Sequence, residues 1–178
     1  MKIPKVRFNF YLPAALCLGL AFLAACSTAR QTRQPQAIMR FHVETTPAPA
    51  VETTTVAIYR AKPVVLSIAK DPALDERFID DARVVESMGG YSLEIKFGLR
   101  GTWMLEQISL AQRGKRLAIF CAFAGMDTNY SRWLAAPMMN KRLADGVLVF
   151  TPDATREETE LIAAGVNQTV KLRKKNEL

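Results

Sequence analysis

Residues 91–125 read YSLEIKFGLRGTWMLEQISLAQRGKRLAIFCAFAG, and they predict a strand, a helix and a second strand in immediate succession. Residues 91–97 alternate apolar and polar side chains, which is the period of a strand with one buried face. Residues 117–124 form a nearly continuous apolar run, too short for an ordinary helix, and predict a central strand buried on both faces. We expect the chain to fold around these three elements.

The helix between the two strands is predicted from the spacing of its apolar residues. The residues that recur at helical spacing are Met104, Leu105, Ile108 and Ala111. Thr102 can cap the first turn, and Gly114 supplies a C-terminal stop. We therefore expect Phe97, from the first strand, and Ile108 to face one shared core.

Short apolar patterns on either side add strands to the predicted sheet. We expect these strands around residues 39–43, 54–59, 64–68, 84–85 and 146–150. Pro137 denies the segment 133–139 one backbone donor, which predicts an edge strand or a strand end there. The predicted fold class is α+β: a small single domain over residues 38–172, mainly antiparallel sheet packed by two or three short helices, followed by a charged tail at 173–178.

A short acidic helix is predicted before the central stretch. Leu74, Phe78 and Ala82 recur every four residues, which is typical of one helix face. The carboxylates on its outer side would be Asp75, Glu76, Asp80 and Asp81. A calcium loop would need oxygen ligands at alternate positions, and Phe78 and Ile79 occupy positions where those ligands should be. We therefore expect a solvated acidic face and no metal.

A last helix is predicted near the C-terminus. Thr155 and Glu158 have the spacing of a capping box, in which each residue satisfies a backbone donor of the first turn. Gly165 or Asn167 is expected to end this helix. Residues 166–172 can then continue as a final strand.

The first 25 residues have the pattern of a secretory signal peptide. Three cations precede a short apolar stretch that is below the ~20 residues needed to span a bilayer as a helix. The sequence Leu-Ala-Ala-Cys at 23–26 resembles a bacterial lipobox, so we expect cleavage and lipidation at Cys26. Residues 26–37 then form the lipidated N-terminus and a tether, and Ser27 favours sorting to the outer membrane. The alternative is an uncleaved signal anchor with an incidental cysteine.

Processing changes the charge and the cysteine content. Removing 25 of 178 residues leaves 153, with 21 cations against 17 acidic residues, so the net charge falls from +7 to +4. This balance gives little support to nucleic-acid binding. Cys17 leaves with the leader and Cys26 is expected to be lipidated, so Cys121 has no partner for an internal disulfide. We expect Cys121 to be a small buried hydrophobic residue.

Four segments within residues 82–165 follow one another in a recognisable order. After the strand at 91–97 and its helix come GKRLAI at 114–119, AAPMM at 135–139, GVLVF at 146–150 and the helix at 155–165. This succession resembles the periplasmic head subdomain of SecD, a membrane subunit of protein export. The resemblance implies a SecD head-like fold and a surface that contacts extracytoplasmic polypeptide.

The same resemblance does not imply all of SecD's activity. We expect no spanning segment after Cys26 and no base subdomain, and SecD uses its transmembrane helices to couple proton flow to translocation. The loop at 127–133 also replaces a tight Asp-Gly turn of SecD-like sequences. Proton-driven translocase activity is therefore not expected of this chain.

Two functions remain, because the sequence contains no metal-spaced Cys/His set, nucleophile motif or phosphate loop. The first is a lipid-anchored binding or accessory module on the periplasmic face of the bacterial cell envelope. It would contact an envelope protein or polypeptide through a sheet edge or one surface, without a cofactor. The residues of that predicted surface are Arg132, Trp133, Met138, Met139, Lys141 and Arg142. Tryptophan and arginine anchor interfaces and methionine repacks easily, although burial of Trp133, Met138 and Met139 is the simpler alternative.

The second possible function is a periplasmic enzyme whose site is built from scattered residues. Its first candidates are Asp75, Asp80, Glu106 and His42. His42 is the only histidine, and it falls on the polar side of its predicted strand, so we expect it to be solvated. A deep pocket with converging acids would favour the enzyme, and a shallow apolar surface would favour the binding module. The sequence leaves the oligomeric state open.

Overall fold

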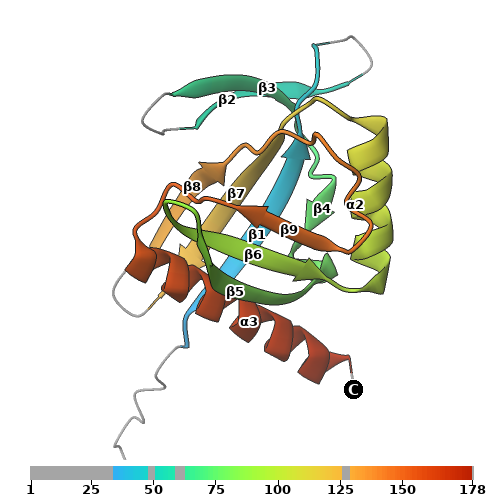
Figure 1. The fold of residues 1–178 in the computed structure, drawn as a ribbon. Helices are drawn as coiled ribbons and strands as arrows, with labels where there is room; N and C mark the ends of the chain where they lie inside the picture. Colours follow the sequence, from blue (N-terminus) through green and yellow to red (C-terminus); the bar gives the residue numbers. More distant parts are fainter. Residues whose placement is uncertain (1–33, 48–50, 59–62, 126–128, 178) are drawn as a thin grey trace, which may run out of the picture. The chain divides into compact units, whose positions relative to one another are not determined.

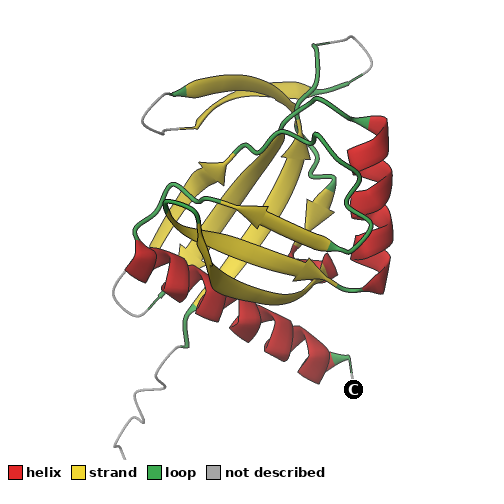
Figure 2. Ribbon diagram, viewed as in Figure 1, coloured by secondary structure: helices red, strands yellow, loops and turns green. Residues whose placement is uncertain are grey.

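The computed structural model describes residues 34–47, 51–58, 63–125 and 129–177, which form three antiparallel sheets, two α-helices and one 3-10 helix (Figure 1). The four-stranded sheet has the order β4 (Leu74–Asp75), β1 (Gln36–Val43), β7 (Leu117–Ala124) and β8 (Asn129–Ala135). The three-stranded sheet has the order β5 (Ile79–Ser87), β6 (Gly90–Phe97) and β9 (Val147–Phe150). The remaining elements are the hairpin β2 (Thr53–Ile58) and β3 (Val64–Ala69), the 3-10 helix η1 (Glu76–Phe78), α2 (Leu99–Ala111) and α3 (Arg156–Asn176). The predicted α+β class, mainly antiparallel, is confirmed (Figure 2).

The main core collects the inward-facing side chains of both larger sheets and of the two helices. Its most deeply buried large members include Met39, Phe41, Leu93, Ile95, Leu105, Ile119 and Ile162. A second, smaller core lies between the hairpin β2–β3 and the four-stranded sheet, and it contains Ala118 of β7. β7 is therefore an interior strand with buried residues on both faces, as its apolar run predicts.

The central stretch folds as expected, with one difference at the start of α2. Phe97 is buried, and Ile108 packs against the same core from the helix. The helix begins earlier than predicted, with Gly98 as its N-cap and no side-chain capping bond. Thr102 lies inside the helix, where its hydroxyl donates to the carbonyl oxygen of Phe97 at 3.3 Å. The prediction of Thr102 as a cap is therefore wrong.

The predicted acidic helix around residues 74–82 does not form. Leu74 pairs with Phe41 of β1, and β5 pairs with β6 over nearly its whole length. Only η1 is helical, and Asp75 caps it by accepting a hydrogen bond from the backbone N–H of Arg77 at 3.0 Å. Pairing with strands distant in sequence therefore overrides the local spacing of four.

α3 is longer than predicted and replaces both the last strand and the charged tail. Gly165 does not end it: a Cβ at this position would lie 3.1 Å from atoms of Ala37, so glycine permits the helix to cross β1 closely. The capping box of Thr155 and Glu158 is present as expected. The domain also begins earlier than residue 38, because β1 starts at Gln36.

Side chains of α3 hydrogen-bond to the backbone of neighbouring elements. The Asn167 amide accepts from the N–H of Ala82 at 2.8 Å and donates to the carbonyl oxygen of Ala82 at 2.7 Å. Arg173 donates to the carbonyl oxygens of Glu76 and Ile79, both at 2.9 Å. The segment predicted as a charged tail is therefore helical as far as Asn176, and Arg173 bonds it to the domain.

Candidate partner-binding surface

Two loops come together at the end of the four-stranded sheet where β7 begins. Residues 137–139 exchange backbone hydrogen bonds with residues 114–117, each 2.9 Å long. This pairing gathers the basic residues of both loops: Arg113, Lys115, Arg116, Lys141 and Arg142. Met138 lies among them and is 46% exposed. The result is a cationic surface with one exposed apolar side chain.

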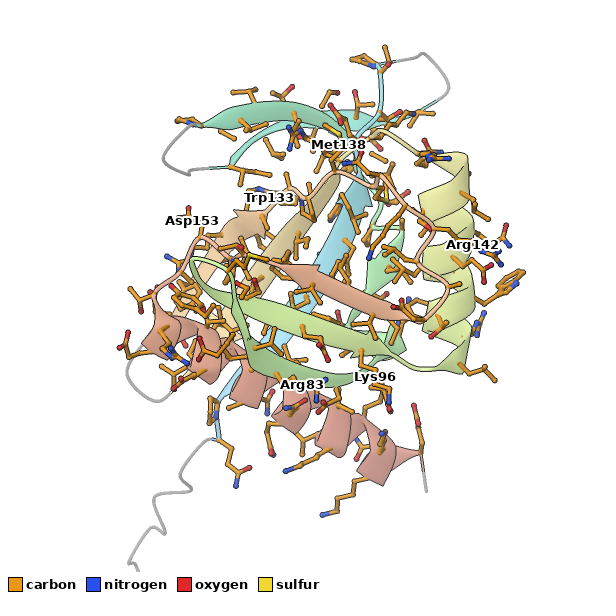
Figure 3. The ribbon with its side chains drawn as sticks, in the orientation of Figure 1. Arg83, Lys96, Trp133, Met138, Arg142 and Asp153 are labelled. Carbon is orange, nitrogen blue, oxygen red and sulfur yellow. The ribbon has the colours of Figure 1, made fainter. Side chains whose placement is uncertain are left out.

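This cationic surface is fastened to α2. Arg142 donates through Nε to Glu106 Oε1 at 2.6 Å, and Figure 3 places Arg142 beside the helix. The buried Ser109 hydroxyl accepts from the N–H of Leu143 at 3.0 Å and donates to the carbonyl oxygen of Glu106 at 2.8 Å. The loop after Met138 is therefore positioned by the helix and does not depend on contacts with a partner.

Trp133 and His42 lie under the hairpin rather than on an open surface. Trp133 packs against the second core, with ring centroids 5.2 Å from Phe120 and 5.4 Å from His42. His42 is only 7% exposed, and its Nδ1 lies 3.0 Å from the carbonyl oxygen of Ala69. Burial lowers the pKa of His42. The expectation of a solvated histidine is wrong, because the hairpin covers this face of β1.

Two other residues of the predicted surface are also placed elsewhere. Met139 is 3% exposed and belongs to the main core. Arg132 lies opposite Cys121 in β8, pairs with Glu158 of α3 at 2.8 Å and covers the Tyr130 ring at 4.8 Å. Of the six predicted contact residues, only Met138, Lys141 and Arg142 lie together on an exposed surface.

Burial also determines the chemistry of Cys121 in β7 and of Tyr130 in β8. The pKa of the Cys121 thiol is raised to about 12 by burial, and burial likewise raises the pKa of Tyr130 to about 12. A thiol with that pKa is protonated at neutral pH and is a poor nucleophile. Cys121 therefore behaves as the small buried residue that its apolar strand predicts.

The four residues proposed for an enzyme do not converge. Asp75 pairs with Arg77, Asp80 with Lys174 and Glu106 with Arg142. The hydrogen bond from Lys174 holds the pKa of Asp80 below its ordinary value. Within the described ranges, no group of acidic, histidine or cysteine side chains could hold a metal ion. Each candidate acid thus has its own basic partner.

A shallow depression of about 420 Å³ lies where η1, α3 and the start of α2 meet. Its lining is Arg77, Phe78, Gly98, Leu99, Arg100, Gly101, Arg173 and Glu177. The guanidinium carbons of Arg77 and Arg100 each lie 6.0 Å from the centre of the Phe78 ring. The depression is therefore rich in arginine, and the sequence patterns did not indicate it.

Sequence patterns also missed the most exposed tryptophan. Trp103 of α2 is 64% exposed, whereas Trp133 is half-buried. The signal that could have found it is its position: Trp103 lies outside the apolar spacing that defines the predicted buried face of the helix.

No protein-family model matches this chain, and no curated protein matches it. Solved structures do match. A structure of SecDF, described as a membrane component that enhances protein export, has a TM-score of 0.51 and 18% identity, covering 93% of this chain and 71% of that chain. A second SecDF structure, in a super-membrane-facing form, has a TM-score of 0.47 and 14% identity, covering 89% of this chain and 33% of that chain. The domain therefore has a SecD head-like α+β fold.

Proposed function

We propose that this protein is a lipid-anchored accessory module of the bacterial cell envelope that contacts extracytoplasmic polypeptide. In this proposal residues 1–25 are a signal peptide, Cys26 carries the lipid, and the following residues tether the domain to the periplasmic face of the outer membrane. The module binds polypeptide without a cofactor, without catalysis and without proton-driven translocation.

The fold likeness to SecDF carries this proposal, because SecDF is described as a component that enhances protein export. The lipobox-like sequence at 23–26 supports the anchor. No helix in the described part of the chain has the length and apolarity needed to cross a bilayer.

The surface offered to polypeptide consists of Met138, Lys141 and Arg142 with the neighbouring basic loop at 113–116. Methionine adapts to varied side chains, and cations at its edge attract acidic segments. Within the domain, Gln36 pairs with Ala124 at one end of the sheet, and this surface lies by Leu117 at the other end, about 24 Å away.

The anchor is tested by mass spectrometry of the protein from cell envelopes. We expect acylated Cys26 at the mature N-terminus, and the variant Cys26→Ser should retain its leader and carry no lipid. An unmodified Cys26 behind an intact leader in the natural protein would contradict the anchor.

Polypeptide contact is tested with a photo-crosslinking residue at position 138 in living cells. A matched control carries the same residue at Leu161, which is exposed on α3, away from the proposed surface. We expect crosslinks to exported polypeptides from position 138 and a background level from position 161. Equal crosslink yields from both positions would contradict the proposed surface. The absence of polypeptide adducts from every exposed position tested would contradict the proposed function.

A further inference from the structure

α2 presents an apolar stripe to solvent. Leu99 is 92% exposed, Trp103 64% and Leu110 51%. Their spacings of four and seven residues place them on one side of a helix with 3.6 residues per turn, over a length of about 16 Å. Single exposed apolar residues are ordinary, but a tryptophan between two leucines in one line is typical of a contact surface.

The packing of the opposite side keeps this stripe exposed. Gly101, Leu105 and Ser109 are the buried residues of α2. A Cβ on Gly101 would lie 2.8 Å from the carbonyl oxygen of Phe78, so the helix already touches backbone there. Rotating α2 to bury the stripe would drive larger side chains into Phe78 and break the bonds of the Ser109 hydroxyl. The stripe therefore cannot close onto its own domain.

Positive charge flanks the stripe at both ends. Arg100 lies at its first turn, which carries no acidic residue, whereas in the adjoining depression Arg77 is paired with Asp75 and Arg173 with Glu177. Arg113 and Lys115 follow its last turn. The acid on this side of the helix is Glu106, and Arg142 neutralises it. The surface thus carries three exposed apolar side chains, with the neutralised Glu106–Arg142 pair between Trp103 and Leu110, and it is cationic at its ends.

We propose that the α2 stripe binds an acidic amphipathic segment of polypeptide, with apolar residues against Trp103 and carboxylates against the cations at either end. This inference rests on the proposed function and deepens it by naming the contact surface and the class of segment. Arg142 connects the cationic surface with the α2 stripe, because it belongs to that surface and bonds to Glu106 of α2. Partners of this kind bind with an apolar helix face against the groove or stripe.

Two other occupants fit the charges less well. The Glu106–Arg142 pair lies beside Trp103 and Leu110, so a bilayer taking up the stripe would have to desolvate an ion pair, whereas a peptide can hydrogen-bond to it. A second copy of the stripe would bring Arg100 or Arg113 against another arginine, in either orientation. An acidic peptide avoids the repulsion between arginines, and a single helix covers less of the Glu106–Arg142 pair than a bilayer would.

The test measures binding of synthetic peptides to the purified full chain by calorimetry. One peptide of about 15 residues, long enough to span the stripe as a helix, carries leucines on one face and glutamates at both ends. Its control carries lysines in place of the glutamates. We expect the glutamate peptide to bind at least about tenfold more tightly, with an affinity that falls as salt rises.

Variants locate the site. Trp103→Ser should weaken the glutamate peptide at least about tenfold, because tryptophan anchors carry much of the affinity of such contacts. The double variant Arg100→Gln and Arg113→Gln should reduce the preference for glutamate over lysine. Leu161→Ser removes an equally exposed leucine from α3 and should change nothing. Trp103 and Leu161 are both exposed, so circular dichroism should show that each variant stays folded.

Three results would overturn the inference. The first is equal affinity for the two peptides, or binding that Trp103→Ser leaves unchanged. The second is binding to phosphatidylglycerol vesicles but to neither peptide, which would make the stripe a lipid contact. The third is self-association of the protein that Trp103→Ser abolishes, which would show that the stripe binds a second copy of the chain. Polypeptide crosslinks at position 138 with no effect of Trp103→Ser would leave the proposed function intact and remove only this inference.

Discussion

The two long helices are attached to the same domain in different ways. α3 bonds to its neighbours through polar side chains: Asn167 bonds to Ala82, Arg173 donates to three backbone carbonyls, and Glu158 accepts from Arg132 of β8. α2 begins at Gly98 with no side-chain cap and holds to the core along one narrow line of residues. The difference indicates that α3 stabilises the sheets, whereas the outer side of α2 is available for contacts.

The largest expected effect separates the two sides of α2. Leu105 is fully buried, so Leu105→Ala should lower the free energy of unfolding by about 2 to 5 kcal/mol. Leu110→Ala, on the exposed stripe, should change it by about 0.5 kcal/mol or less. Denaturant unfolding of both variants checks this. Similar losses for the two leucines would mean that the outer side of α2 is not free.

A smaller effect is expected for the polar attachment of α3. Asn167→Ala leaves the N–H and carbonyl of Ala82 without their side-chain partner, which should cost about 2 to 3 kcal/mol. The matched control is Lys171→Ala, at an exposed position one turn further along α3. Thermal and denaturant unfolding measure both variants. If Asn167→Ala is as stable as Lys171→Ala, the two amide hydrogen bonds make no net contribution to stability, and the two helices are attached less differently than described.

The smallest effect concerns pH. The hydrogen bond from the Thr155 backbone, followed by that from Arg132, holds the pKa of Glu158 below its ordinary value. The folded state therefore binds this proton less readily than the unfolded state, and the stabilisation present above about pH 4.5 is lost as pH falls. Glu158→Gln should flatten the decline of stability between about pH 5 and 3. The free energy of unfolding is measured against pH for both proteins. If Glu158→Gln leaves its decline in acid unchanged, the charge of Glu158 does not contribute to the cap.

Where short-range patterns decide the structure, the sequence predicted it. The alternation of 91–97 and the apolar run of 117–124 each allow one arrangement against the core, and both strands formed. The capping box at Thr155 is also local, since its two side chains each bond to the other residue's backbone, three positions away. The α+β class followed from these elements.

Where packing between distant segments decides, the sequence was insufficient. Leu74 and Ala82 are both buried, but in two strands of different sheets, because β1 and β6 supply the pairing. Gly165 resembled a helix stop, yet its lack of a side chain lets α3 approach Ala37. Local spacing does not reveal either partner.

The candidate surface was predicted in part, for the same reason. Met138, Lys141 and Arg142 are exposed because the loop turns out from its pairing with residues 114–117. Trp133 is covered by a hairpin far away in sequence. The exposure of Trp103 was predictable, because this residue lies outside the apolar spacing that includes the buried Leu105.

The Asn167 amide has a consequence for the outer edge of the three-stranded sheet. Its two bonds to Ala82 occupy hydrogen-bonding positions that an added strand would use on the outer side of β5. Unpaired strand edges are templates for aggregation, and natural proteins cover them. At β5, the Asn167 amide of α3 already fills the hydrogen-bonding positions of Ala82, so a strand adding to this edge would first have to displace it.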